Sequence, residues 1–317
     1  MRGKPAHFMS HKRKLPLWLV VLLSLLLAVL VVVMVLNTVK DIHGPAEHVA
    51  IPYTQQPVTE EIEKIIAEDE KLADVPVLPR AESGIALVID DVGYDMAGLR
   101  RILDLSVPIA IAVIPDAPYA SESAELAHQA DQVVMLHLPM EPTTEKYRNN
   151  MSAAFLHEKL NAEQLRATFQ ANLDRVPHAE GVNNHMGSYL TQLAEPMREV
   201  MQLCHEQGLF FVDSKTSSKS VAAEMAEAAG LAWASRRIFL DHDINEEAML
   251  KAWQRARSCV EKGQRCLVIG HPHRETLKFL EKHLSRLDAS NMISVKQMLS
   301  PAVSKQENKR STPAELL

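Results

Sequence analysis

The sequence predicts an α/β domain on a parallel β-sheet, closed or nearly closed into a barrel of about seven strands. Short β-branched apolar runs recur between residues 83 and 300, and segments with helical apolar spacing separate them. The runs are almost continuously apolar, as is typical of strands buried on both faces. Seven such units in about 215 residues suit a barrel, and an open doubly wound sheet is the alternative.

Each predicted unit is a strand followed by a helix. The strands, in chain order, are IALVID (85–90), IAIAVIP (109–115), VVMLHLP (133–139), GVNNHMG (181–187), LFFVDS (209–214), IFLDHD (238–243) and CLVIGHP (266–272). Residues typical of helix starts and ends mark the boundaries of the predicted helices. Asn161 with Gln164 resembles a capping box, Gly208 is a stop signal, and Asn245 and Gly263 bracket a further helix.

The N-terminus predicts a membrane anchor. Residues 15–36 contain no charged side chain, and the tail 1–14 before them carries five Lys and Arg and no acid. About 20 apolar residues cross the hydrocarbon core, and the basic flank stays in the cytoplasm. No small-x-small cleavage site follows, so we favour an uncleaved anchor over a signal peptide. We therefore expect a single-pass protein of a bacterial inner membrane with its domain in the periplasm.

The remaining chain divides by composition. Residues 37–82 combine five prolines with an acidic run, which predicts a linker with one short amphipathic helix. Residues 301–317 lack apolar periodicity and predict a disordered tail. The folded domain is then expected at 83–300.

Charge and cysteine content exclude two classes of function. The chain has 34 Lys and Arg residues and 40 Asp and Glu residues. Without the five basic residues of the tail, 29 basic residues remain against the 40 acidic ones. An acidic domain without a basic cluster is a poor nucleic-acid binder. The three cysteines have no metal-binding spacing and cannot form a disulfide framework.

Polar side chains follow the predicted strands where each strand ends. They are Asp90, Asp91, Asp116, His137, Asn183, Asn184, His185, Asp213, Ser214, Asp241, His242, Asp243, His271 and His273. The carboxyl ends of parallel strands share one rim, so these side chains are expected near one another. Carboxylates and imidazoles there predict a divalent metal, Zn²⁺ foremost, with Mn²⁺, Ni²⁺ or Co²⁺ as alternatives.

The adjacent Asp90 and Asp91 can serve different partners. One carboxylate can ligate the metal while the other takes a proton from water. The alternative for Asp91 is that it caps a helix beginning near Tyr94, with Gly93 permitting the turn.

The ordered motifs resemble a known family. IALVIDDVGYD, IAIAVIPDAPY, MLHLPMEP, GVNNHMGS, FFVDSKTS and VIGHPHRET together look like the divergent polysaccharide deacetylases, distant relatives of NodB-type carbohydrate esterases. The resemblance covers roughly 83–297. It implies a distorted (β/α) barrel and metal-dependent removal of N- or O-acetyl groups from an envelope glycan. The implied partners are an acetylated polysaccharide or peptidoglycan-type glycan and proteins of the cell envelope.

The resemblance also implies residue roles. Asp90 corresponds to the catalytic base and Asp91 to a metal ligand. NodB-type enzymes take two further ligands from one His-x-x-x-His motif; this chain has His137 but Glu141 four residues on. We therefore expect His185, on the next strand, as the third ligand.

His271 corresponds to the histidine that protonates the leaving amine. His273 is expected either to position His271 or to ligate the metal itself. Asn184 and Asp213 are further candidate site residues.

Two other functions compete with this hypothesis. The first is a glycan-binding or scaffolding protein that retains the barrel and the metal rim without turnover. The second is a metal-free hydrolase that uses Ser214 with Lys215 or a rim histidine, which the absence of a GxSxG elbow disfavours.

Overall fold

The computed structural model describes residues 81–284 and 291–301, all within one compact unit, Val75–Leu317. The predicted basic tail (1–14), membrane anchor (15–36), nearly all of the linker (37–82) and nearly all of the tail (301–317) lie outside the described residues. Within the described ranges, none of the helices combines the length and the apolar character needed to cross a bilayer.

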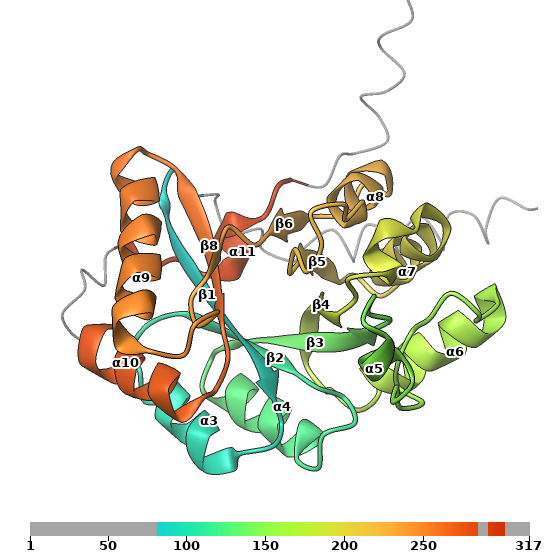
Figure 1. Cartoon of the computed structure of the whole chain (residues 1–317), viewed down its shortest axis with the longest axis horizontal. Coiled ribbons are helices and arrows are strands. Elements are labelled where there is room, and N and C mark those ends of the chain that lie inside the picture. Colours follow the sequence, from blue (N-terminus) through green and yellow to red (C-terminus); the bar gives the residue numbers. More distant parts are fainter. Residues whose placement is uncertain (1–80, 285–290, 302–317) are drawn as a thin grey trace, which may run out of the picture. The chain divides into compact units, whose positions relative to one another are not determined.

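Eight strands form one parallel sheet (Figure 1). They are β1 (Gly84–Val92), β2 (Ile109–Val113), β3 (Val133–Met140), β4 (Ala179–Met186), β5 (Phe210–Asp213), β6 (Trp233–Ser235), β7 (Ile238–Phe239) and β8 (Arg265–Gly270). Their order is β6-β5-β4-β3-β2-β1-β8-β7. Leu87 of β1 pairs with Ile109 of β2 on one side and with Val268 of β8 on the other, so the last strand returns beside the first.

The sheet is a half-barrel, which corrects the prediction in two respects. All seven predicted strands are present, but β6 is an eighth, because three residues (WAS) are too short to form a recognisable apolar run. In the described part of the chain no ladder joins β6 to β7, so the barrel stays open there. The doubly wound alternative is not observed, since the order from β1 to β6 never reverses.

Helices cover the outer face of this sheet. They are α3 (Met96–Leu103), α4 (Ala120–Gln129), α5 (Glu145–Arg148), α6 (Ala162–Leu173), the 3₁₀ turn η1 (Leu190–Gln192), α7 (Ala194–Glu206), α8 (Ala222–Ala228), α9 (Glu246–Glu261) and α10 (Arg274–Leu284). The short helix α11 (Val295–Met298) instead packs on the inner face. In Figure 1, α9, α10, α3 and α4 succeed one another beside β8, β1 and β2, and α6, α7 and α8 continue past β3 to β6.

The helix boundaries follow the expected signals. Asn161 and Gln164 form the capping box of α6, and the Asn245 side chain accepts the Ala248 amide at the start of α9. Gly208 and Gly263 follow α7 and α9 with φ of +68°, a conformation that glycine adopts without strain.

The helix cap proposed for Asp91 is wrong. Asp95 caps α3 by accepting the Ala97 amide, and Asp91 remains part of β1. Asp91 is therefore available for another partner.

Alternate strand residues pack into two apolar clusters. On β1, Ile85, Leu87 and Ile89 join the cluster that includes the helices, whereas Ala86 and Val88 join a second cluster inside the half-barrel. The second cluster also includes residues of α11, which packs against β1 and β8. The strands are therefore buried on both faces, as predicted.

Candidate metal centre

Polar side chains occupy the interior face of the sheet at the carboxyl ends of its strands. Strand residues alternate between faces, so the positions that continue the interior apolar cluster can be read from the sequence. On or just past β1, β3, β4, β5 and β8 these positions are Asp90, His137, Asn183, Ser214 and His271.

A backbone irregularity brings Asp91 to the same cluster. Pairing between β1 and β2 shifts register between Ile89 and Val92, and Asp91 has a φ of +57°. Such a bulge redirects a side chain that regular alternation would point outward. The neighbouring carboxylates consequently both approach His137: Asp91 Oδ1 lies 3.1 Å and Asp90 Oδ2 3.7 Å from its Nε2.

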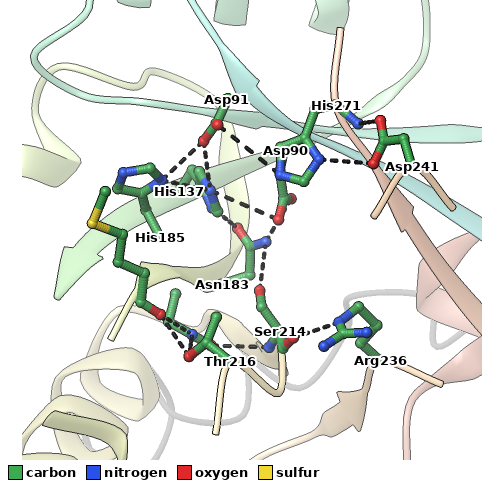
Figure 2. Close-up of polar contacts among 12 residues, drawn as sticks. Asp90, Asp91, His137, Asn183, His185, Ser214, Thr216, Arg236, Asp241 and His271 are labelled. Carbon is green, nitrogen blue, oxygen red and sulfur yellow. Dashed lines mark hydrogen bonds and ion pairs between the residues drawn. The ribbon is translucent and has the colours of Figure 1, made fainter. Parts of the chain in front are cut away.

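Three potential ligand atoms form a small triangle (Figure 2). Asp91 Oδ1 lies 2.9 Å from His185 Nδ1 and 3.1 Å from His137 Nε2, and the two nitrogens lie 3.2 Å apart. Register places the histidines together, because β3 and β4 pair His137 with Asn183 and Pro139 with His185. Ligands about 2.0–2.1 Å from a tetrahedral Zn²⁺ are themselves about 3.3 Å apart, close to these edges.

Hydrogen bonding at the triangle also fits a cation. Asp91 Oδ1 is buried and makes no hydrogen bond to any described residue, although two imidazole nitrogens lie near it. His137 Nδ1 lies 2.9 Å from Asn183 Oδ1, an acceptor, so Nδ1 carries the proton and Nε2 presents a lone pair to the triangle. Asn183 Nδ2 in turn donates to Asp90 Oδ1 at 2.7 Å, which fixes the amide orientation.

A cavity of about 360 Å³ opens beside these residues. Its lining comprises Asp90, His137, Asn184, Ser214, Lys215, Thr216, Arg236, Phe239, His242, Ile269 and His271. A pocket of this size accommodates a sugar-sized ligand.

Sequence comparison assigns the family. A model of the divergent polysaccharide deacetylases matches residues 87–299, more than half of the chain. The chain belongs to the divergent polysaccharide deacetylase family.

Two relatives and one solved structure resemble this deacetylase-family chain. The uncharacterized protein YibQ of Escherichia coli is 32% identical over 203 residues, 64% of this chain and 63% of YibQ, so the match spans less than two thirds of that relative. An uncharacterized Haemophilus influenzae protein is 35% identical over 65% of this chain and 73% of its own length. The crystal structure of uncharacterized ATU2773 from Agrobacterium tumefaciens shares the fold, with a TM-score of 0.62 and 17% identity over 68% of this chain and 89% of that one.

In this member of the divergent polysaccharide deacetylase family, a buried carboxylate holds His271. His271 Nδ1 lies 3.0 Å from Asp241 Oδ1, while Asp241 Oδ2 accepts the His271 amide at 2.7 Å and the Thr276 hydroxyl at 2.8 Å. These contacts direct His271 Nε2 toward the cluster, where it lies 4.0 Å from Asp91 Oδ2. Burial disfavours a charged imidazole, but the hydrogen bond and charge of Asp241 outweigh burial and raise the pKa of His271 to about 9.

The two adjacent carboxylates differ electrostatically. Burial raises the pKa of Asp90, although the charges of His137 and His271 oppose the shift. Burial also acts to raise the pKa of Asp91, but contacts from His137 and His185 prevail and hold it well below its usual range. Burial acts to lower the pKa of His137, and the carboxylates outweigh it and raise that pKa. Concentrated negative charge of this kind would also stabilise a divalent cation.

His273 lies apart from the triangle. It groups with Asp241 and His271, its ring centroid is 5.7 Å from that of His271, and it is exposed. Both Asp241 oxygens already accept hydrogen bonds, in contrast to Asp91 Oδ1. This arrangement suits the positioning alternative for His273 better than the ligand alternative.

Asn184 and Asp213 have local structural partners. Asn184 Nδ2 donates to the Met186 carbonyl and its Oδ1 accepts the Ser214 amide. Asp213 accepts the Lys215 amide and the Ser220 hydroxyl. Asn184 also lines the cavity, whereas Asp213 does not.

Glu141 is buried away from the ligand triangle. It accepts the Glu158 amide and pairs with Arg148 at 2.9 Å, so the residue at the position of the motif's second histidine has partners of its own.

The sequence places Asn183 at the rim without indicating its role, and it gives no indication that Arg236 and Phe239 lie there. Asn183 is at a strand end, but an amide is neither a metal ligand of choice nor an acid, so only its contacts show its importance. Arg236 precedes the predicted strand 238–243, and Phe239 lies inside it rather than at its end. The strand-end pattern therefore indicated His242, which also lines the cavity, but neither Arg236 nor Phe239.

Proposed function

We propose that this chain is a membrane-anchored, metal-dependent hydrolase that removes acetyl groups from an envelope polysaccharide or glycan. The observation that carries the proposal is the convergence of Asp91 Oδ1, His137 Nε2 and His185 Nδ1, with Oδ1 buried and without a hydrogen bond in the described part of the chain. Family membership supports the reaction class. The proposed metal is Zn²⁺, since two imidazoles and one carboxylate are a common catalytic zinc set.

The metal site and the acid–base groups have separate tasks. A divalent cation held by Asp91, His137 and His185 would supply Lewis-acid activation of water and of the acetyl carbonyl. Asp90 accepts a proton at its carboxylate, and burial raises its pKa, which strengthens it as a base.

His271 completes the reaction as the acid. Its Nε2 carries a proton at neutral pH, because Asp241 raises its pKa to about 9. That proton goes to the nitrogen or oxygen that leaves the acetyl group, while Asp241 maintains the ring orientation. Hydrolysis then yields acetate and the free amine or hydroxyl.

The proposed location follows from the N-terminal sequence. The charge-free stretch 15–36 and the basic tail before it support an inner-membrane anchor that places the domain in the periplasm. An envelope glycan is the acetylated polymer accessible from there.

Metal content and hydrolysis of acetylated sugars test the proposal together. We expect one equivalent of transition metal in the purified full chain, with His137→Ala and His185→Ala losing it and exposed His205→Ala retaining it. Release of acetate from acetylated chitooligosaccharide or a model acetyl ester should follow metal content. Metal without acetate release would favour the glycan-binding or scaffolding alternative, and a well-folded protein that takes up no metal would overturn the mechanism.

A further inference from the structure

Two permanent cations line the cavity beside the proposed base. Arg236 and Lys215 line the same cavity as Asp90, whose side chain is its only lining carboxylate among the described residues. Arg236 and Lys215 thus form a positively charged wall of the cavity. A neutral sugar would not complement this charge.

Backbone carbonyls hold Arg236 in place, and none of the described residues is its counter-ion. Its Nε donates to the Ser214 carbonyl at 2.6 Å and its Nη2 to the Lys215 carbonyl at 2.8 Å. The guanidinium lies 5.0 Å from the centre of the Phe239 ring. Within residues 81–284 and 291–301, no carboxylate forms an ion pair with it and its Nη1 makes no hydrogen bond. A half-buried guanidinium so arranged is preorganised to bind an anion.

Desolvation of Arg236 agrees with this arrangement. Burial lowers the pKa of the guanidinium, and the charges of Asp213 and Asp90 only partly oppose the shift. The partial burial of this charge has a free-energy cost that a bound anion would offset.

Ser214 adds a buried donor to the same wall. Its side chain is 5% exposed, and its Oγ accepts from Asn183 Nδ2 at 3.2 Å. Across the described residues, the Ser214 hydroxyl proton has no acceptor. Lys215 Nζ, 3.4 Å from Asp213 Oδ2, is a second cation at the site. Together they give a guanidinium, an ammonium and a hydroxyl donor around one cavity.

We propose that this wall is an anion subsite and that the acetylated sugar accepted by the cavity carries a carboxylate or a phosphate. The inference rests on the proposed function for the acetylated sugar and on Arg236, Lys215 and Ser214 for the charge. A hydroxyl group could accept from these donors, but only an anion also neutralises Arg236.

Equilibrium binding of three related sugars to the metal-loaded full chain tests the proposal. N-acetylglucosamine is neutral, N-acetylmuramic acid adds a carboxylate, and N-acetylglucosamine 6-phosphate adds a phosphate to the same ring. We expect at least one charged sugar to bind about ten-fold or more tightly than the neutral one, with a preference that falls as salt is raised. The charged sugar that is preferred identifies the chemical source of the anion.

Substitutions assign the preference to the wall. Arg236→Gln should abolish the preference and Lys215→Met should reduce it, because each should lower the affinity for the charged sugar by a larger factor than the affinity for the neutral one. Arg237→Gln is the matched control, because Arg237 is the adjacent arginine but is exposed and absent from the lining of this cavity. If Arg236→Gln does not fold, Lys215→Met and the salt dependence of the wild type decide the question.

The outcomes separate this inference from the proposed function. Equal affinity for all three sugars, or a preference that survives in folded Arg236→Gln, overturns the anion subsite even if acetate is released. A charge preference that depends on Arg236 supports the subsite even if no acetyl group is hydrolysed, and in that case the deacetylase mechanism fails alone.

Discussion

Asn183 donates a 2.7 Å hydrogen bond from its amide to Asp90 Oδ1. The same side chain accepts from His137 Nδ1, so one buried amide orients both the proposed base and a proposed metal ligand (Figure 2). Asn183 is fully buried and lies one strand away from His137 in register. It is a positioning residue, since its own atoms lie outside the ligand triangle.

Substituting Asn183 should weaken the metal site. Asn183→Ala removes the acceptor that keeps the His137 proton on Nδ1, and loss of such a partner typically costs about 10–100-fold in metal affinity. Competition with a chromogenic chelator measures the change. Asn150→Ala, at an exposed amide, is the control, and an unchanged affinity in folded Asn183→Ala would contradict the role.

Removing the metal should lower thermal stability. A ligand present at about 1,000 times its Kd stabilises the native state by about 4 kcal/mol. A chelator is therefore expected to lower the Tm of the wild type by several degrees and to leave that of His185→Ala unchanged. Differential scanning fluorimetry gives both values, and an equal response of the two proteins would argue against a cation at the triangle.

The two neighbouring aspartates should respond differently to substitution. Asp90→Asn removes the proposed base and should lower kcat by about 10²–10⁴-fold with metal content retained. Asp91→Asn should lose the metal as well. Elemental analysis alongside acetate release distinguishes the two variants, and full activity in Asp90→Asn would show that another group is the base.

Asp241 should support both activity and stability. Its carboxylate accepts hydrogen bonds from the His271 ring, the His271 amide and Thr276. Asp241→Ala leaves these donors without their partner, which should cost about 1–3 kcal/mol for each buried group left unsatisfied. Urea unfolding reports the stability. Thr276→Val, which removes one donor only, should have the smaller effect and leave kcat nearly unchanged.

The cysteines should be unreactive in the folded protein. Cys204, Cys259 and Cys266 are buried and free, and burial raises the pKa of the Cys266 thiol to about 12. The thiolate is the reactive form, so labelling of the native protein should stay slow as the pH rises from 7 to 9. In denaturant, thiols near their ordinary pKa should react faster over that range. Rapid labelling of the native chain would indicate local opening around α7, α9 or β8, whichever holds the labelled cysteine.

The sequence alone determined the fold class and most of the rim residues. Strand alternation and helix caps depend on neighbouring residues, so seven strands, the α6 capping box and the strand-end positions of Asp90, His137 and His271 could all be predicted. The three-residue strand β6 could not be predicted, because a segment that short has no measurable periodicity.

Only the tertiary structure decided which atoms meet. The positive φ of Asp91 turns its side chain to the interior, and the register of β3 against β4 places His185 beside His137. Asn183 and Arg236 became significant only through contacts with residues distant in sequence. Periodicity is a local property that assigns a side chain to a face, whereas a site requires distances between strands, which register, bulges and packing set.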